Sequence, residues 1–243
     1  MRFPQVILTN TTSFISPNKL VSIAIDTIVF DLGGVLIDWQ PAYVFLKEFR
    51  GNQNKMNEFL DTICAWEWNL NQDAGYPIAD ATRERIALYP EYERLIKMYY
   101  GRWEEMLGRA HKDTLAILSF LKHSTDYRLL ALTNWSHETF PVAQKKFPWL
   151  EWFEGIVVSG QERIRKPDPE IYIRLIERYQ IQANRAVFID DNQDNVRAAQ
   201  ALGFHGIKFK DGHDLAHSLI QLGLNFPAEL IKHIQDPLQQ LDL

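Results

Sequence analysis

Polar side chains follow four predicted strands of this sequence, each close to the point where the strand ends. In chain order, the groups that could do chemistry there are Asp31, Thr133 with Asn134, Lys166, and Asp190 with Asp191. Because the carboxyl ends of parallel strands lie at one edge of a sheet, these groups can converge on a single crevice. The sequence therefore predicts one composite site built from four separate stretches.

The three aspartates of this set favour a cation. Asp31, Asp190 and Asp191 would repel one another by about 1 kcal/mol per pair in water, and by more when partly buried. A hard cation between the carboxylates removes this cost, and oxygen-only ligands suit Mg²⁺. We therefore expect Mg²⁺ as the cofactor.

The remaining groups favour phosphate. The Thr133 hydroxyl, the Asn134 backbone N–H and the Lys166 ammonium are donors suited to the oxygens of a transferred phosphoryl group. Asp31 is the candidate nucleophile, because an aspartate carboxylate can form an aspartyl-phosphate intermediate. These residue types together indicate phosphoryl-transfer chemistry.

Gly33 and Gly34 follow the candidate nucleophile directly. Glycine lets the main chain pass close to a bound anion or metal, so Gly34 is a candidate for substrate binding. Each of the four stretches also has a structural interpretation. Asp31 can cap a local turn, the Thr-Asn pair can cap a helix, the lysine can be a solvated surface residue, and the Asp-Asp pair can begin a loop and cap the next helix. Four such coincidences in this order are far less common, so we favour a joint site.

The elements that position these groups alternate between strand and helix along most of the chain. Strands are predicted at residues 28–32, 127–133, 156–158, 186–189 and 206–209. Helices are predicted at residues 111–122, 136–147, 169–179 and 194–202. This alternation is typical of a parallel sheet with helices on both faces, an α/β fold with a Rossmann-like core.

A purely helical stretch interrupts the alternation after the first strand. Helices are predicted at residues 41–50, 53–66, 78–88 and 91–107, with a loop at 69–77. We expect an all-helical cap (39–107) inserted into a core domain (23–38 and 108–243), preceded by an N-terminal arm (1–22). The cap should select the substrate through its loop and through Trp39, Trp66 or Trp68, although helical spacing favours the bundle core for most of these tryptophans.

Composition narrows the class of protein. The chain has 243 residues, 46% of them hydrophobic, and a net charge of −5 with no basic stripe, so nucleic acid is not an expected partner. No apolar run is long enough to span a membrane, and the N-terminal segment lacks the features of a signal peptide. The single cysteine, Cys64, excludes an intramolecular disulfide. We expect a cytoplasmic enzyme; the sequence does not indicate its oligomeric state.

The four stretches together resemble the motifs of the haloacid dehalogenase (HAD) superfamily. The matching segments are FDLGGVL (30–36), LTNW (132–135), RKPDPEIY (165–172) and FIDDNQDNV (188–196). The helical insertion resembles the C1 cap of that superfamily. Within it, the chain looks most like bacterial sugar-phosphate phosphatases of the glucose-1-phosphatase kind and the N-terminal phosphatase domain of soluble epoxide hydrolase.

The resemblance implies a role for each motif residue. Asp31 would be the nucleophile and a Mg²⁺ ligand, Thr133 and Asn134 would hold the phosphate, and Lys166 would bridge phosphate and nucleophile. The other roles concern the metal: Asp191 as a direct ligand, Asp190 as a direct or water-mediated ligand, the Gly33 carbonyl as a ligand, and Asn195 as the residue that orients them.

One position departs from the pattern. Most phosphatases of the superfamily carry a second aspartate two residues after the nucleophile as general acid and base, and here that position is Gly33. A positioned acid–base group contributes about 10²–10⁴-fold to the rate. Asp38 lies too far along the chain to replace it, and Asp73 in the predicted cap loop is a candidate that no sequence pattern supports.

Three functions therefore stay open. The first is a Mg²⁺-dependent phosphatase acting on a small phosphorylated metabolite such as a sugar phosphate. The second is a protein that binds a phospho-ligand or a partner with little or no turnover, because the acid is missing. The third is a dehalogenase, in which Asp31 would attack carbon without a metal; the aspartate-rich fourth motif argues against it.

Overall fold

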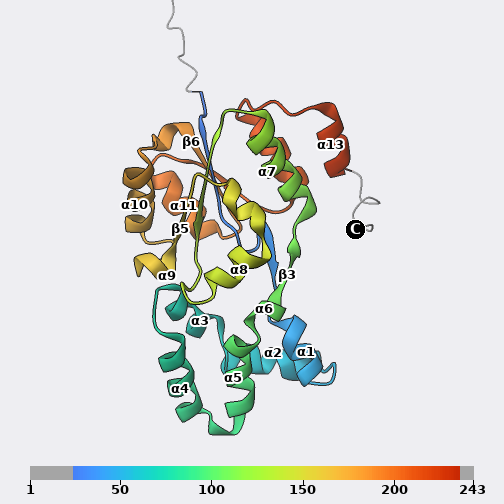
Figure 1. The fold of residues 1–243 in the computed structure, drawn as a ribbon, viewed down its shortest axis with the longest axis vertical. Helices are drawn as coiled ribbons and strands as arrows, with labels where there is room; N and C mark the ends of the chain where they lie inside the picture. The colour runs from blue at the N-terminus through green and yellow to red at the C-terminus, as the bar shows by residue number, and fades with distance from the viewer. Residues whose placement is uncertain (1–23, 236–243) are drawn as a thin grey trace, which may run out of the picture.

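A five-stranded parallel sheet forms the centre of the computed structural model, which describes residues 24–235 (Figure 1). The predicted arm at residues 1–22 lies outside the described residues. The strand order is β5-β4-β1-β6-β7. These strands are β1 (Thr27–Phe30), β4 (Arg128–Thr133), β5 (Gly155–Val158), β6 (Ala186–Asp190) and β7 (His205–Lys208). The predicted α/β fold is confirmed.

β1 is the central strand and pairs in parallel with β4 on one side and β6 on the other. Its side chains alternate between the two faces of the sheet: Ile28 and Phe30 pack into one hydrophobic cluster and Val29 into the other. Both faces are apolar, as expected for a parallel strand covered on both sides. The strand ends at Phe30, so Asp31 is the first residue beyond it.

Helices cover both faces of the sheet. The cluster around Ile28 includes side chains from α7 (Lys112–Ser124), α8 (Phe140–Lys146), α12 (Gly212–Gln221) and α13 (Ala228–Gln235). The cluster around Val29 includes side chains from α10 (Pro169–Tyr179) and α11 (Gln193–Ala201). The short helix α9 (Ser159–Glu162) and the 3-10 turns η2 (Pro148–Trp152) and η3 (Ala183–Arg185) complete this body. The predicted helix at 136–147 begins only at Phe140.

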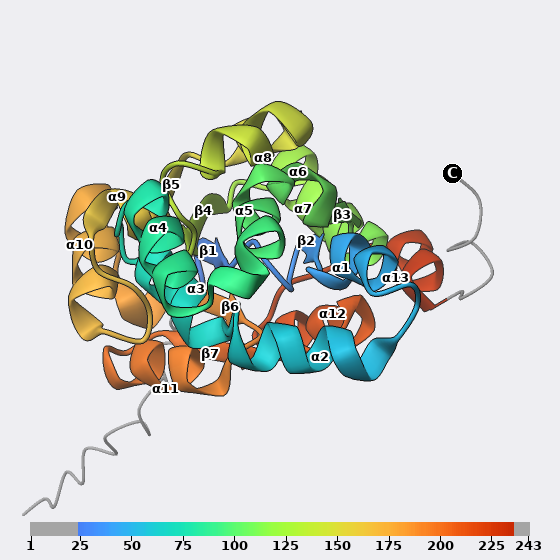
Figure 2. The same cartoon turned by 90° about the horizontal axis from the view of Figure 1, so that it is seen from below.

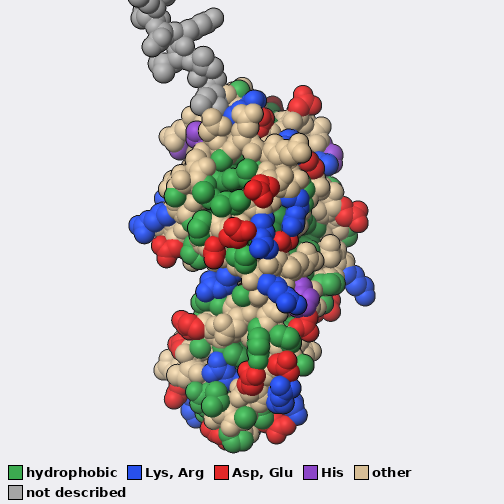
Figure 3. Space-filling model, turned by 90° about the vertical axis from the view of Figure 1, so that its left-hand side faces the viewer, with side chains coloured by type: hydrophobic (Ala, Val, Ile, Leu, Met, Phe, Trp, Pro, Cys, Tyr) green, Lys and Arg blue, Asp and Glu red, His purple; other side chains and the backbone are tan. Residues whose placement is uncertain are grey.

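The chain between β1 and β4 forms a second, helical body below the sheet in Figure 1. Its elements are α1 (Ala42–Glu48), α2 (Gln53–Thr62), α3 (Trp66–Asp73), α4 (Ile78–Leu88), η1 (Pro90–Tyr92), α5 (Glu93–Gly101) and α6 (Trp103–Met106). Its centre is aromatic, with the rings of Phe45 and Phe59 5.1 Å apart and those of Trp68 and Tyr99 5.3 Å apart. The molecule narrows between the two bodies (Figure 3). From below, the helical body lies across the carboxyl edge of the sheet (Figure 2).

Two short strands join the bodies. β2 (Ile37–Trp39) leads into the helical body and β3 (Leu107–Ala110) leads out of it, and the two pair antiparallel. Neither strand is predictable from the sequence, because three or four residues are too few to show a clear period of two. The chain therefore crosses between the bodies at two adjacent places.

The predicted loop at 69–77 is wrong over its first half, where α3 continues to Asp73. The polar side chains that suggest a turn are instead bonded within and against the helix. The Asn69 amide donates to Asp73 Oδ2 one turn later (3.0 Å), and the Tyr100 hydroxyl donates to Asn69 and Gln72. The predicted helix at 91–107 is divided at Arg102 into α5 and α6. None of the helices within residues 24–235 has the length and apolar character that crossing a membrane requires.

Candidate active site

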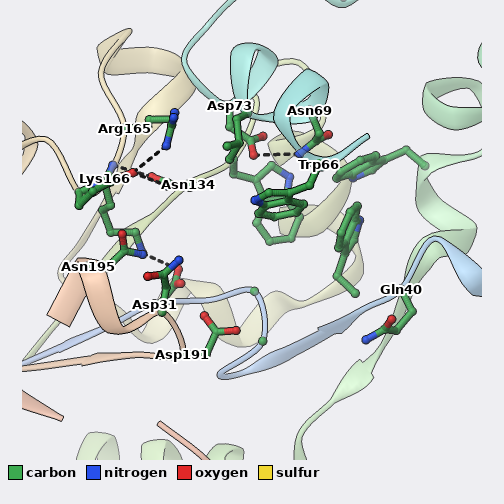
Figure 4. Close-up of a pocket in the computed structure, with 18 residues that line it drawn as sticks. Asp31, Gln40, Trp66, Asn69, Asp73, Asn134, Arg165, Lys166, Asp191 and Asn195 are labelled. Carbon is green, nitrogen blue, oxygen red and sulfur yellow. Dashed lines mark hydrogen bonds and ion pairs between the residues drawn. The ribbon is translucent and has the colours of Figure 1, made fainter. Parts of the chain in front are cut away.

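Asp31 lies at the carboxyl edge of the sheet, directly beyond β1. Its backbone N–H donates to the Ile189 carbonyl of β6 (2.8 Å), which continues the strand pairing up to this residue. Its carboxylate Oδ1 accepts the Leu32 backbone N–H (2.7 Å). The side chain is almost fully buried and borders a cavity that opens towards the helical body (Figure 4).

Lys166 brings three of the predicted motifs together. Its fully buried ammonium lies 2.9 Å from Asp31 Oδ1 and 2.7 Å from Asp190 Oδ2, and it donates to the Leu132 carbonyl (2.8 Å). Burial lowers the pKa of Lys166, but the Asp190 and Asp31 carboxylates outweigh this effect and hold that pKa above its ordinary value. The ammonium therefore stays charged between two acids.

Asn134 fixes the backbone of that lysine. Its side-chain Oδ1 accepts the Lys166 N–H (2.8 Å) and its Nδ2 donates to the Lys166 carbonyl (3.0 Å). The Asn134 side chain is thus occupied, and its backbone N–H is the donor left for a ligand. Beside it, Thr133 Oγ1 is buried and has no hydrogen-bond partner among the described residues. An unpaired buried hydroxyl is costly, so this one is available to a ligand oxygen.

The three predicted metal-binding aspartates form one cluster. One carboxylate oxygen from each of Asp31, Asp190 and Asp191 lies within 4.8 Å of the others. Burial raises the pKa of Asp31 to about 7; the Lys166 ammonium opposes this rise, and the other two carboxylates add to it. The negative charge gathered here exceeds what one ammonium neutralises.

The donor set fits a hard cation. Asp190 is held by the Asn192 backbone N–H (2.7 Å) and by Asn195 Nδ2, at 3.0 and 3.1 Å from its two oxygens. The Asn195 Oδ1 atom is buried and has no partner among the described residues. Carboxylate, amide and carbonyl oxygens that crowd together without a balancing charge are ligands for Mg²⁺.

The two glycines after the nucleophile differ in their surroundings. Gly34 has φ +74°, and a Cβ there would lie 2.4 Å from Asp191 Oδ2, so this position requires glycine. A Cβ on Gly33 would meet no atom within 4 Å. The position where an acid is missing therefore has space for a side chain.

The cavity beside Asp31 has a volume of about 420 Å³ and is lined by both bodies. The joining strand β2 contributes Trp39. The helical body contributes Trp66, Trp103, Asn69 and Asp73, and the body around the sheet contributes Arg165 and Trp135 beside the motif residues. Trp66 is 54% exposed and Trp39 half-buried, so these two belong to the cavity wall, whereas Trp68 is buried in the cap as its helical spacing predicts. The sequence pattern gives no sign that Trp103 and Arg165 line the cavity. The one available signal is that Arg165 stands next to Lys166 in the third motif.

Comparisons with known proteins agree with this geometry. Residues 25–203 match the family model of the haloacid dehalogenase-like hydrolases. The chain is 23% identical over 197 residues to a phosphorylated carbohydrates phosphatase of Thermotoga maritima, covering 80% of this chain and 87% of that protein. It is 28% identical over 120 residues to flavin mononucleotide hydrolase 1 of Arabidopsis thaliana, a match that spans 49% of this chain and about half (48%) of that protein.

A solved structure shares the fold. It is a HAD family enzyme from Bacteroides thetaiotaomicron in complex with magnesium and inorganic phosphate, with a TM-score of 0.62 and 26% identity. The similarity covers 80% of this chain and 98% of that one.

Proposed function

This chain belongs to the haloacid dehalogenase-like hydrolase family, and we propose that it is a Mg²⁺-dependent phosphatase acting on a small phosphorylated metabolite. The observation that carries the proposal is the position of Lys166 Nζ, 2.9 Å from Asp31 and 2.7 Å from Asp190, within the aspartate cluster. This arrangement combines a nucleophile, a fixed positive charge and a set of cation ligands at one point.

Asp31 is the proposed nucleophile. Its carboxylate oxygen attacks phosphorus, the bond from phosphorus to the substrate oxygen breaks, and an aspartyl-phosphate remains. Water then attacks that phosphorus, which releases inorganic phosphate and restores Asp31. The Leu32 N–H and the Lys166 ammonium, both bonded to Asp31 Oδ1, fix the carboxylate so that its other oxygen is free to attack.

Other residues of the chain bind the phosphoryl group. The Thr133 hydroxyl and the Asn134 backbone N–H offer donors, and Lys166 neutralises charge that develops on the oxygens. Asp31, Asp191 and the Gly33 carbonyl would hold Mg²⁺, together with Asp190, and Asn195 would orient this set. When bound, Mg²⁺ supplies positive charge to the phosphoryl oxygens and removes the repulsion among the carboxylates.

The cap, residues 39–107, is the proposed selector of the substrate. The names of the two relatives, a phosphorylated carbohydrates phosphatase and a flavin mononucleotide hydrolase, support a phosphorylated small molecule. A cavity of about 420 Å³ with aromatic walls suits a substrate with one ring or a short chain.

Dehalogenation, the third function that the sequence leaves open, stays a candidate because Gly33 leaves the acid position empty as it is in that chemistry. Attack of Asp31 on carbon needs no cation, so it gives no reason for three converging carboxylates. We therefore rank it below phosphate ester hydrolysis.

The test is phosphate release from a panel of phosphorylated metabolites, with Mg²⁺ and with a chelator. We expect metal-dependent release that Asp31→Asn abolishes and that Asp194→Asn, an exposed aspartate of α11, leaves intact. Equal release from the wild type and Asp31→Asn would refute the mechanism. Chloride release from 2-chloropropionate in the chelator would instead establish dehalogenation, and binding of phosphate without product would indicate a non-catalytic protein.

A further inference from the structure

We propose that Asp73, which the cap contributes, is the general acid and base that the core lacks at Gly33. The inference rests on the proposed phosphatase function and names the residue that protonates the leaving group. It starts from the position of Asp73 at the end of α3, in the wall of the same cavity that Asp31 borders.

The in-line geometry of phosphoryl transfer places the leaving oxygen on the side of the cavity where Asp73 lies. In phosphoryl transfer the attacking and leaving oxygens lie roughly in line, so the leaving oxygen points away from Asp31. Figure 4 shows Asp73 across the cavity from Asp31, on the cap side. A general acid must reach the leaving oxygen directly or through one water molecule, and the opposite wall is the side from which it can do so.

Asp73 belongs to the cap but is held by the core. Asp73 Oδ2 accepts the Asn69 amide (3.0 Å), and the backbone N–H of Ser136, in the loop after β4, faces the carboxylate and lowers its pKa. The Ser159 hydroxyl of α9 donates to the Asp73 carbonyl. The Asn69 amide and the Ser136 N–H therefore orient the carboxyl group, while the Ser159 hydroxyl ties the Asp73 backbone to the core.

Among the titratable groups that line the cavity in the described part of the chain, Asp73 is the one without another assignment. Lys166 is bonded to two aspartates and a carbonyl, Asp31 and Asp191 belong to the cation cluster, and an arginine such as Arg165 does not release its proton. Asp73 is therefore the remaining group at this site that can transfer a proton.

The protonation of Asp73 suits this role. Burial raises its pKa to about 7, while the Ser136 N–H and the Arg165 guanidinium partly oppose the rise. From the cap, Tyr99 and Tyr100 of α5 face the same carboxyl group, and burial holds the pKa of each hydroxyl far above neutrality. Near neutral pH a substantial fraction of Asp73 carries a proton, which is the condition for an acid that must also act as a base.

As the Asp31 oxygen bonds to phosphorus, the ester bond breaks with its electron pair on the substrate oxygen, and the Asp73 proton moves to that oxygen to give the free alcohol. The Asp73 carboxylate then takes a proton from the water that attacks the aspartyl-phosphate. Phosphate leaves, and both aspartates return to their starting states.

The experiment compares p-nitrophenyl phosphate with phenyl phosphate, two esters of similar shape. Nitrophenolate leaves without a proton, whereas the phenolate of the second ester needs one. We expect Asp73→Asn to lower kcat for phenyl phosphate by about 10²–10⁴-fold and to change kcat for p-nitrophenyl phosphate far less. Adding Gly33→Asp to this variant should restore phenyl phosphate hydrolysis, because that position has space for a side chain.

The controls separate a chemical role from a structural one. Ser159→Ala removes the hydrogen bond to the Asp73 backbone and leaves the carboxyl group in place, so it should affect both esters equally. An equal loss of both activities in Asp73→Asn would overturn the inference and leave the phosphatase intact. A wild-type protein that releases phosphate from neither ester, nor from the metabolite panel, would overturn the proposed function and this inference with it.

Discussion

Gly34 and Asp191 approach so closely that a Cβ on the glycine would lie 2.4 Å from the carboxylate Oδ2. The glycine also has φ +74°, which a residue with a side chain adopts only with strain. The turn after Asp31 and the aspartate cluster are therefore fitted to each other. One added carbon atom would move Asp191, a proposed metal ligand.

Gly34→Ala should weaken Mg²⁺ binding. The methyl group displaces Asp191, so we expect at least a tenfold higher Mg²⁺ requirement for phosphate release and a weaker Mg²⁺ signal in calorimetry. Gly33→Ala is the matched control, since its Cβ meets no atom within 4 Å. Similar losses in both variants would show that the turn, and not the contact with Asp191, is responsible.

Lys166→Met should destabilise the fold in a pH-dependent way. The variant leaves the buried carboxyl groups of Asp31 and Asp190 without their cation, and breaking a buried ion pair in this way costs about 3–5 kcal/mol. The loss should be largest at pH 8 and smaller at pH 5, where Asp31, whose pKa burial raises to about 7, takes up a proton. Urea unfolding in a chelator measures it, with the exposed Lys55→Met as control; a loss independent of pH would contradict the electrostatic cause.

Asp73 should make the free protein less stable as the pH rises. Its pKa is raised from 3.8 to about 7 in the folded state, so the native protein binds the extra proton between these values. Stability therefore falls as pH rises through this window, by up to about 1.4 kcal/mol per pH unit for one carboxyl group. Asp73→Asn should reduce this slope in urea unfolding at pH 5, 6 and 7, and an unchanged slope would refute the assignment.

Trp66 and Trp68 should respond differently to truncation. Trp66 is 54% exposed at the cavity wall, so Trp66→Ala should raise KM by up to about tenfold, since an aromatic contact contributes about 0.5–1.5 kcal/mol. Trp68 is buried, and Trp68→Ala should instead lower the free energy of unfolding by about 3–5 kcal/mol. Steady-state kinetics and urea unfolding of both variants test the distinction, which fails if Trp66→Ala unfolds as readily as Trp68→Ala.

The sequence predicts the sheet well because each of its strands is a short apolar run that fits few other secondary structures. β1, β4 and β6 were each predicted to within two residues, and the polar residues at their ends do lie together. The order of the motifs was sufficient to predict which side chains would meet. It did not predict that the Asn134 side chain would be used to hold Lys166, because this depends on the exact separation of two loops.

The cap was predicted less well, for reasons of local chemistry. Residues 69–73 have the polar composition of a turn, yet Asn69 and Asp73 are spaced by four and bond to each other on one face of α3. The same spacing places Asp73 in the cavity. The core was favoured for most of Trp39, Trp66 and Trp68. Trp68 lies there, but Trp39 of β2 and Trp66 of α3 lie in the cavity wall, because burial depends on what lies opposite a side chain and not on its spacing alone.

The paired strands β2 and β3 have a consequence for how such a protein can change. Because the chain leaves the sheet and returns to it at neighbouring positions, the whole helical body is an insertion whose two ends already meet. An insertion of this kind adds little loop-closure cost to the host sheet. Helical modules from other proteins could be grafted between Ile37 and Ala110 while Asp31, Lys166 and the proposed metal ligands remain as they are. On the proposed mechanism, the exchanged module would have to bring its own proton donor.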